Sequence, residues 1–357
     1  MRIAVLNYAD VRNFGDVLFP LIVAHEISRR RPDAQMDYVT PTGSSWAGMK
    51  SIRLDAAELA SYDALILGGG EIVHRADAML RDIYRLFHLP SIERPTELVF
   101  GWTSAPVPFK AWIGLGVPEP SADVLPDIRS AMSALDFIGV RGTRSAERLR
   151  CAAPDVEVQV RQTPDIGWLF PRLLEGRNPL NAAIGSPYVA VQALGFPDVS
   201  STAAALQRIA RKTGLRIVLL PLTRCWQDVK PLRELRDAGG GTFFLVSDYV
   251  SDLDKLGILG AATLYIGQSM HGFIGAMSQC RPAGLCMRGA DDKFNELLLD
   301  TEMQHLRVDS WDHVEELAER LLALPLDVIC KHRARIEAEL DSLFDDVCDQ
   351  MADASAP

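Results

Sequence analysis

Polar and glycine residues recur directly after short apolar runs of the sequence, where they could bind or activate a ligand. The clearest case is the segment 267–272 (GQSMHG), which follows the apolar run 263–266 and precedes a helical pattern. The start of a helix favours the neutral form of a histidine, which can accept a proton. A lone histidine is more often structural, but the flanking glycines and this position favour proton transfer by His271. The binding residues expected around it are Gln268, Ser269, Met270 and Gly272.

A run of three glycines follows the apolar run 64–67: Gly68, Gly69 and Gly70, with Glu71 next. Each glycine loses more backbone entropy on folding than alanine, so the run is unfavourable for stability. A glycine loop can present backbone N–H groups to a phosphate or carboxylate. A plain tight turn is the alternative. The loop lacks the patterns of a dinucleotide fingerprint or a P-loop, so neither kind of site is expected.

Arg141 ends the apolar run 137–140, and Ser145 follows four residues later. The planar guanidinium of an arginine fits carboxylate and phosphate oxygens, so Arg141 is a candidate ligand for an anion. The alternative is a structural ion pair with an acidic neighbour, for which Asp165 is the candidate.

The segment after the first apolar run, 3–6, contains Asn13, Gly15 and Asp16. Gly15 permits a tight turn and close approach of a ligand. Asp16 can cap the following helix or bind substrate, and both roles are compatible because a helix N-terminus is a natural anion site.

Short apolar runs alternate with amphipathic stretches along the whole chain, which predicts α/β units with parallel strands. The expected strands are 3–6, 64–67, 98–101, 137–140, 156–160, 188–193, 216–220, 242–246, 263–266 and 283–285. The expected helices are 17–30, 78–87, 124–134, 143–151, 201–213, 228–237, 251–261, 272–279, 311–322 and a closing helix, 326–349.

The loop-rich stretch 171–187 interrupts this alternation and predicts a domain boundary. We therefore expect two tandem Rossmann-like doubly wound parallel-sheet domains, 1–175 and 176–325, followed by a helix that packs across both and a frayed tail, 326–357. Ligands bind outside the carboxyl ends of parallel strands, so a cleft between the two domains is the expected site.

Composition excludes several classes of protein. The 357 residues have a net charge of −10 and 48% hydrophobic residues, which fits a globular protein and argues against general nucleic-acid binding. No apolar run approaches the roughly 20 residues of a membrane span, and residues 1–7 are too short an apolar stretch for a signal peptide. The six cysteines form no Cys-x-x-Cys pair, so we expect no metal site and reduced thiols in the cytoplasm. Glu71 and His74 are only weak metal candidates.

Taken in order, these motifs make the chain resemble the polysaccharide pyruvyl transferase family, from about residue 13 to about residue 300. The resemblance implies a GT-B-like fold and transfer of a pyruvyl group from phosphoenolpyruvate to a sugar of a glycan, as a ketal, in exopolysaccharide biosynthesis. Phosphoenolpyruvate would be a co-substrate, with no further cofactor. The partners would be this small donor and a glycan acceptor, with peripheral contact to a lipid-linked glycan as an option.

The resemblance also implies roles for the residues. His271 would transfer the proton, Arg141 would bind the donor, and Asp16 or Glu71 would act on the acceptor. The first domain would be the acceptor side and the second domain the donor side. Family members commonly have arginine two residues before this histidine, where this chain has Ser269. Either another cation compensates, with Arg224, Arg288 and Lys293 as candidates, or the donor is not phosphoenolpyruvate.

Two other functions fit the sequence: a GT-B glycosyltransferase with a nucleotide-sugar donor, and a catalytically lapsed sugar- or anion-binding protein that lacks the arginine at Ser269. The segment 102–120, with two tryptophans and four prolines, is a candidate sugar-facing loop, and a packed surface or a dimer contact fits it equally well. The acceptor sugar, the ketal positions and the oligomeric state are not specified by any of these motifs.

Overall fold

The computed structural model describes residues 1–177, 184–185, 187–287 and 292–354. The chain divides into two compact units: Met1–Ile166 with Glu337–Pro357, here unit 1, and Gly167–Ile336, here unit 2. Part of the expected boundary stretch, residues 178–183 and 186, lies outside the described residues, as does Arg288.

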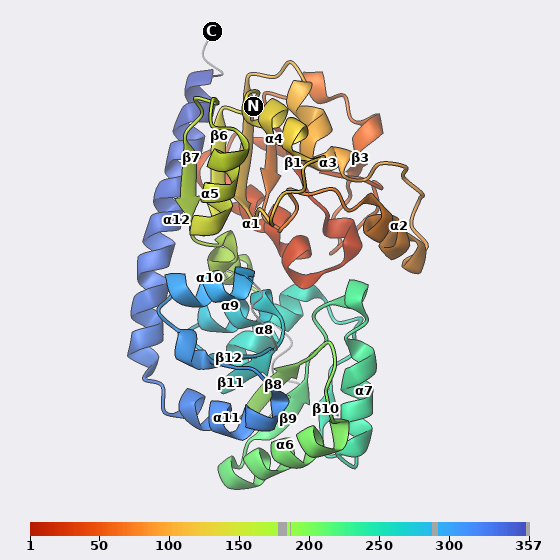
Figure 1. Ribbon diagram of the computed structural model, residues 1–357, viewed down its shortest axis with the longest axis vertical. Helices are drawn as coiled ribbons and strands as arrows, with labels where there is room; N and C mark the ends of the chain where they lie inside the picture. The colour runs from red at the N-terminus through yellow and green to blue at the C-terminus, as the bar shows by residue number, and fades with distance from the viewer. Residues whose placement is uncertain (178–183, 186, 288–291, 355–357) are drawn as a thin grey trace. The chain divides into compact units, whose positions relative to one another are not determined.

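Unit 1 is built on a seven-stranded parallel sheet flanked by helices (Figure 1). Its strands lie in the order β3-β2-β1-β4-β5-β6-β7. Their bounds are β1 Arg2–Leu6, β2 Gln35–Thr40, β3 Ile52–Arg53, β4 Ala64–Gly68, β5 Phe109–Leu115, β6 Phe137–Arg141 and β7 Val160–Thr163. The helices are α1 Phe14–Arg30, α2 Asp77–Leu86, α3 Glu97–Phe100, α4 Leu125–Met132 and α5 Thr143–Ala152.

Unit 2 repeats this architecture with six parallel strands in the order β10-β9-β8-β11-β12-β13. Their bounds are β8 Tyr188–Gln192, β9 Arg216–Leu219, β10 Phe244–Leu245, β11 Leu264–Gly267, β12 Ala283–Cys286 and β13 Arg307–Val308. The helices are α6 Val199–Thr213, α7 Val229–Ala238, α8 Asp252–Ala261, α9 Met270–Met277, α10 Asp292–Asp300 and α11 Val314–Leu322. The long α12, Leu326–Ala354, begins in unit 2, and its part from Glu337 onward belongs to unit 1.

The central strands are buried along their whole length and are almost entirely apolar, because helices cover both faces of each sheet. Strand β4 (ALILG) and strand β8 (YVAVQ) are buried at every position. This continuous burial explains why the strands appear in the sequence as unbroken apolar runs rather than as alternating patterns.

Both sheets have the strand order of a Rossmann fold, which confirms the predicted fold class. In each sheet the order reverses between the first strand and the fourth: between β1 and β4 in unit 1, and between β8 and β11 in unit 2. In folds of this kind the loops after these two strands diverge to opposite sides and leave a crevice at the carboxyl edge. A ligand site is therefore expected at this point of each unit.

Some of the expected elements are wrong. Residues 98–101 are not a strand: they belong to α3 and the short 3-10 helix Gly101–Ser104. An apolar run of four residues does not distinguish a strand from a buried helical turn by its periodicity. The sequence analysis missed strands β2, β3 and β13. Strands β3 and β13 have only two residues each, and β2 has six residues but several polar side chains, so none forms an apolar run.

The expected sugar-facing loop 102–120 is also wrong. Its middle is strand β5, which lies between β4 and β6. Trp102 and Trp112 are 1% and 0% exposed, so neither ring is available to a ligand. The prolines lie before and after β5, because a proline within a central strand would remove a hydrogen bond from the sheet.

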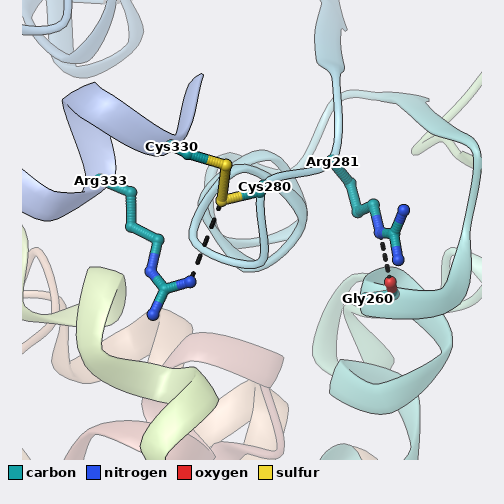
Figure 2. The surroundings of a disulfide bond; sticks show 5 residues. All are labelled: Gly260, Cys280, Arg281, Cys330 and Arg333. Atoms are coloured by element: carbon teal, nitrogen blue, oxygen red, sulfur yellow. Dashed lines mark hydrogen bonds between the residues drawn. A yellow bond between two sulfur atoms is a disulfide. The ribbon is translucent and has the colours of Figure 1, made fainter. Parts of the chain in front are cut away.

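The expectation of six reduced thiols is wrong for two cysteines. Cys280, just after α9, and Cys330, in the first part of α12, form a disulfide with their Cα atoms 5.2 Å apart (Figure 2). They are 50 residues apart in the sequence, so only the packing of α12 brings them together. The guanidinium of Arg333 lies beside the bridge, with Nη1 3.9 Å from Cys280 Sγ. Cys151, Cys225, Cys286 and Cys348 are free thiols.

Candidate functional site

The first candidate residues of unit 1 lie around the crevice between β1 and β4. Asn7, at the end of β1, donates a hydrogen bond from Nδ2 to the Gly68 carbonyl at the end of β4 (3.0 Å). Asn13 precedes α1 and donates from Nδ2 to Asp16 Oδ2 (2.9 Å). The expectation that Asp16 caps the helix is thus wrong. Asn13 is the N-cap residue, and Asp16 lies in the first turn, where a negative charge stabilises the helix dipole.

Two of the three glycines are required by packing. A Cβ atom on Gly68 would lie 2.6 Å from Val23 of α1, and one on Gly69 would lie 2.1 Å from the ring of Phe19. The N–H group of Gly69 donates to the Ile113 carbonyl (2.8 Å) and is therefore not directed at an anion. These two positions are glycine because α1 packs closely on the end of β4.

Gly70 is different because it faces Asp16. Its φ is +88°, and a Cβ atom there would lie 3.2 Å from Asp16 Oδ1. Its carbonyl accepts a hydrogen bond from the N–H of Gly116 (2.7 Å), and Glu71 forms an isolated β-bridge with Gly116. The loops after β1, β4 and β5 therefore meet here.

Arg141, the last residue of β6, is 8% exposed and forms an ion pair with Asp165 (Nη1 to Oδ2, 2.6 Å). The structural ion pair with Asp165, which the sequence analysis offered as the alternative role of Arg141, is therefore present. A Cβ atom on Gly116 would lie 2.8 Å from Arg141 Nε, so the guanidinium packs on the backbone of Gly116. Ser145 is also buried, and its Oγ accepts a hydrogen bond from the N–H of Val117 (3.1 Å).

The structure thus gathers the candidate residues of unit 1 into one group at the carboxyl edge of its sheet. Gly116 connects them, since it touches both Gly70 and Arg141. This glycine was missed by the sequence analysis because it lies inside the stretch expected to be a loop. The group holds one buried guanidinium and the carboxylates Asp16, Glu71 and Asp165.

A further buried carboxylate, Asp10, lies at the same edge and was also missed. It is 1% exposed, and its Oδ2 accepts hydrogen bonds from the N–H and the hydroxyl of Thr42 (3.0 and 2.8 Å). Burial raises the pKa of Asp10 from 3.8 to about 6, against the opposing effect of the Thr42 hydrogen bonds. These bonds connect the loops that follow β1 and β2.

The raised pKa of Asp10 predicts a pH-dependent stability. Because the folded pKa exceeds the unfolded one, the stabilising effect of the proton is complete below pH 3.8 and is lost as the pH rises through about 6. At 1.36 kcal/mol per pKa unit, the free energy of unfolding should fall by about 3 kcal/mol over this range. Urea unfolding from pH 4 to pH 8 measures it.

The variant Asp10→Asn should lose this pH dependence, because an amide keeps an acceptor for Thr42 and does not titrate. Asp33→Asn, at an exposed position, is the matched control and should behave as the wild type. Equal pH profiles for Asp10→Asn and the wild type would contradict the assignment to Asp10.

In unit 2, His271 lies at the crevice between β8 and β11. It is the second residue of α9, which begins at Met270 rather than at Gly272 as expected. The side chain is half-buried, its Nε2 atom is shielded from solvent, and its ring centroid lies 6.3 Å from that of the buried Phe170. The sequence placed this histidine correctly at a strand end and helix start.

The glycines that flank His271 make room for Tyr265. A Cβ atom would lie 2.2 Å from the Tyr265 hydroxyl oxygen if placed on Gly267, and 2.4 Å from it if placed on Gly272. The fully buried Tyr265 hydroxyl donates to the Ser269 carbonyl (3.5 Å), and burial raises the pKa of Tyr265 far above its usual value. These glycines fix the path of the His271 segment.

Two buried polar residues that the sequence analysis missed hold this segment in place. Gln192, at the end of β8, accepts a hydrogen bond from the Gln268 N–H (3.1 Å) and donates from Nε2 to Asp228 Oδ2 (3.1 Å). Gln268 Oε1 accepts from the Leu194 N–H (2.7 Å). A glutamine that ends a strand buried at every position is the signal that could have revealed this network.

Ser269, which stands where the family that the chain resembles commonly has arginine, stabilises the start of helix α9. It is the N-cap of α9, and its Oγ accepts a hydrogen bond from the N–H of Gly272 (3.1 Å). Of the cations considered as substitutes, Arg224 stacks on the ring of Tyr249 (5.3 Å) and Lys293 lies over the ring of Phe294 (5.6 Å).

Removing this cap should weaken unit 2. The variant Ser269→Ala should lower the free energy of unfolding by about 1 kcal/mol, because a buried helix N-terminus loses its acceptor. Ser269→Asp, which keeps an acceptor, is the matched control and should retain most of the stability. Urea unfolding measures both. A similar loss for the two variants would contradict the capping role.

Two further features are absent from the described ranges. No three His, Cys, Asp or Glu side chains there come together in a way that could hold a metal ion. Nor does any helix within those ranges have the length and apolarity that crossing a membrane requires.

The order of these motifs along the chain decides the family. A family model described as polysaccharide pyruvyl transferase matches residues 13–286, which include both groups of candidate residues. The chain belongs to the polysaccharide pyruvyl transferase family. The match starts at Asn13 and ends at the last residue of β12, so it spans most of both units of this pyruvyl transferase family member. No curated protein matches the chain by sequence.

Solved structures show which fold this family member has. The structure of MnaA from S. aureus with UDP is 11% identical, with a TM-score of 0.55, and the match covers 94% of this chain and 90% of that chain. The UDP-GlcNAc 2-epimerase of Methanocaldococcus jannaschii is 10% identical, with a TM-score of 0.54 and coverage of 91% and 93%. At such low identity the likeness concerns the fold alone, which is of the GT-B type.

Proposed function

We propose that this protein transfers the pyruvyl group of phosphoenolpyruvate to two hydroxyl groups of a sugar in a glycan, forming a ketal and releasing phosphate. The observation that carries the proposal is the family match over residues 13–286. His271 and Arg141 support it, because each lies at the carboxyl edge of a Rossmann-like sheet, where ligands bind in such folds.

Ketal formation requires several proton transfers. The methylene carbon of the enol must gain a proton to become the methyl group, and two sugar hydroxyls must each lose one as their oxygens bond to the neighbouring carbon. The bond from that carbon to the phosphate oxygen breaks. The methylene carbon takes one of the two hydroxyl protons, and the released phosphate takes the other. An imidazole can give and take protons near neutral pH, so His271 is the residue proposed for these transfers.

The donor carries a carboxylate and a phosphate, which need cationic or N–H partners. Arg141 is the proposed ligand for one of these groups, because a guanidinium has five N–H donors and Asp165 can orient it without using all of them. The first turn of α1, preceded by Asn13, offers further N–H groups. Asp16 and Glu71 are proposed to act on the acceptor hydroxyls.

The proposal is tested by incubating the protein with phosphoenolpyruvate and a panel of oligosaccharides. Phosphate release should depend on both substrates, and mass spectrometry should detect a ketal-bearing sugar. Calorimetry should detect saturable binding of phosphoenolpyruvate alone. If neither binding nor phosphate release occurs with any oligosaccharide of the panel, the proposed donor is wrong.

A second candidate, a glycosyltransferase with a nucleotide-sugar donor, is favoured by one observation. Two solved structures of the same fold are described with UDP: MnaA from S. aureus, and the M. jannaschii epimerase, in a complex that also contains UDP-GlcNAc. Calorimetry with UDP and GDP separates the candidates. Saturable heat with either nucleotide, and none with phosphoenolpyruvate, would favour the glycosyltransferase.

A further inference from the structure

Large apolar side chains are exposed along the carboxyl edge of the unit 2 sheet. Leu194 is 48% exposed, Trp226 52% and Tyr249 82%. Each follows a different strand: β8, β9 and β10 respectively. Exposed aromatic side chains grouped in one region commonly mark a binding surface.

The strand order brings these residues into one row. All strands of the sheet are parallel, so their carboxyl ends share one edge, and the order β10-β9-β8-β11 sets the order of the loops. Along that edge the loops carry Tyr249, Trp226, Leu194 and then His271. Neighbouring strands are about 5 Å apart, so the row extends over about 15 Å.

Direct contacts connect the outer part of the row. Arg224 and Trp226 belong to the same 3-10 helix, and the Arg224 guanidinium lies 5.3 Å from the centroid of the Tyr249 ring. Cys225, between them, is 7% exposed and anchors the helix in the protein. We call Leu194, Arg224, Trp226 and Tyr249 the aromatic surface.

Buried hydrogen bonds anchor the part of the aromatic surface that contains Arg224 and Trp226. Asp228 is 1% exposed, and its Oδ2 accepts from the N–H groups of Leu222 and Thr223, just before Arg224 (2.7 and 2.8 Å). The same oxygen accepts from Gln192, which also binds the backbone of Gln268 in the His271 segment. One network therefore connects the segment that precedes Arg224 and Trp226 with the His271 segment.

We infer that the aromatic surface binds the sugar rings of the glycan acceptor. The inference rests on the proposed function. It departs from the expectation that only the first domain is the acceptor side, because it assigns recognition of acceptor sugar rings to a surface of unit 2. The C–H face of a pyranose is apolar and packs on an aromatic ring, while its hydroxyls need donors at the rim, which Arg224 provides. A row of about 15 Å fits two or three linked rings better than one small ligand.

Fluorescence provides a selective test. The protein has six tryptophans, all in the described ranges, and Trp226 is the exposed one, whereas Trp46, Trp102, Trp112, Trp168 and Trp311 are buried. Acrylamide quenching therefore reports mainly on Trp226. Linear oligosaccharides of glucose, galactose or mannose should protect it from quenching, in the wild type and equally in His271→Ala.

Variants of the aromatic surface should weaken binding without affecting the donor. Tyr249→Ala should raise the oligosaccharide concentration needed for protection about tenfold. Trp226→Ala should raise the KM for the acceptor about tenfold and leave the KM for phosphoenolpyruvate unchanged. Phe244→Ala is the matched control, because this aromatic residue of β10 is 41% exposed but lies within the strand, and it should bind as the wild type does.

The outcomes separate this inference from the proposed function. Protection of Trp226 by UDP and by no oligosaccharide overturns the inference, and so does an active enzyme whose acceptor KM is unchanged in Trp226→Ala. Protection by oligosaccharides without phosphoenolpyruvate-dependent phosphate release supports the aromatic surface and contradicts the pyruvyl transfer.

Discussion

Replacing His271 by alanine should reduce phosphoenolpyruvate-dependent phosphate release by about 10²–10⁴-fold, the range that a general acid–base residue contributes. The loss should appear in kcat, because the imidazole is proposed to move protons rather than to hold the donor. Calorimetry should show that the variant still binds phosphoenolpyruvate. Single-turnover assays with saturating donor measure the rate of the chemical step.

Two comparisons make this result specific. His313→Ala changes a histidine whose side chain is 61% exposed, and it should leave the rate unchanged. Arg141→Met combined with Asp165→Asn removes both members of the buried ion pair, so neither partner is left as an uncompensated charge. This double variant should lose donor binding instead. A His271→Ala enzyme with an unchanged rate would mean that another residue transfers the proton.

Breaking the disulfide between Cys280 and Cys330 should lower the free energy of unfolding by about 4 kcal/mol, because it closes a loop of 50 residues in the unfolded chain. The double variant Cys280→Ser with Cys330→Ser, or a dithiol reductant, produces this state. Urea unfolding with and without reductant measures the loss.

Counting thiols provides the control for this prediction. The denatured protein should show four free thiols without reductant and six after reduction. Cys151→Ser, which changes an exposed free thiol, should unfold as the wild type does in both conditions. Six reactive thiols before reduction would show that Cys280 and Cys330 are not joined, as the sequence alone had suggested.

Local patterns were sufficient for most elements because they depend on neighbours in the sequence. The runs that became β4, β8 and β11 are apolar throughout and are bounded by polar or glycine residues, so their type and place followed from hydrophobicity alone. Where a run was only four residues long, as at 98–101, hydrophobicity did not distinguish a strand from the helix α3.

The candidate site was predictable in its residues but not in its contacts. The sequence indicated Arg141 and Asp165 separately, and offered their pairing as one of two interpretations. Whether they pair depends on β6 and β7 lying side by side, which is a matter of strand order. The contacts of Gly116, Asp10 and Asp228 likewise join loops that are distant in the sequence, so they could not be predicted from local patterns.

The sequence by itself determined that this chain forms two parallel α/β sheets and in which order the motifs of its family occur, because strand periodicity and motif spacing are local properties. Tertiary structure alone decided which strand ends meet at each crevice, that Ser269 caps a helix, that two cysteines 50 residues apart are joined, and that Asp10 is buried. Each of these depends on contacts between segments far apart along the chain, and such contacts are set by how the elements pack.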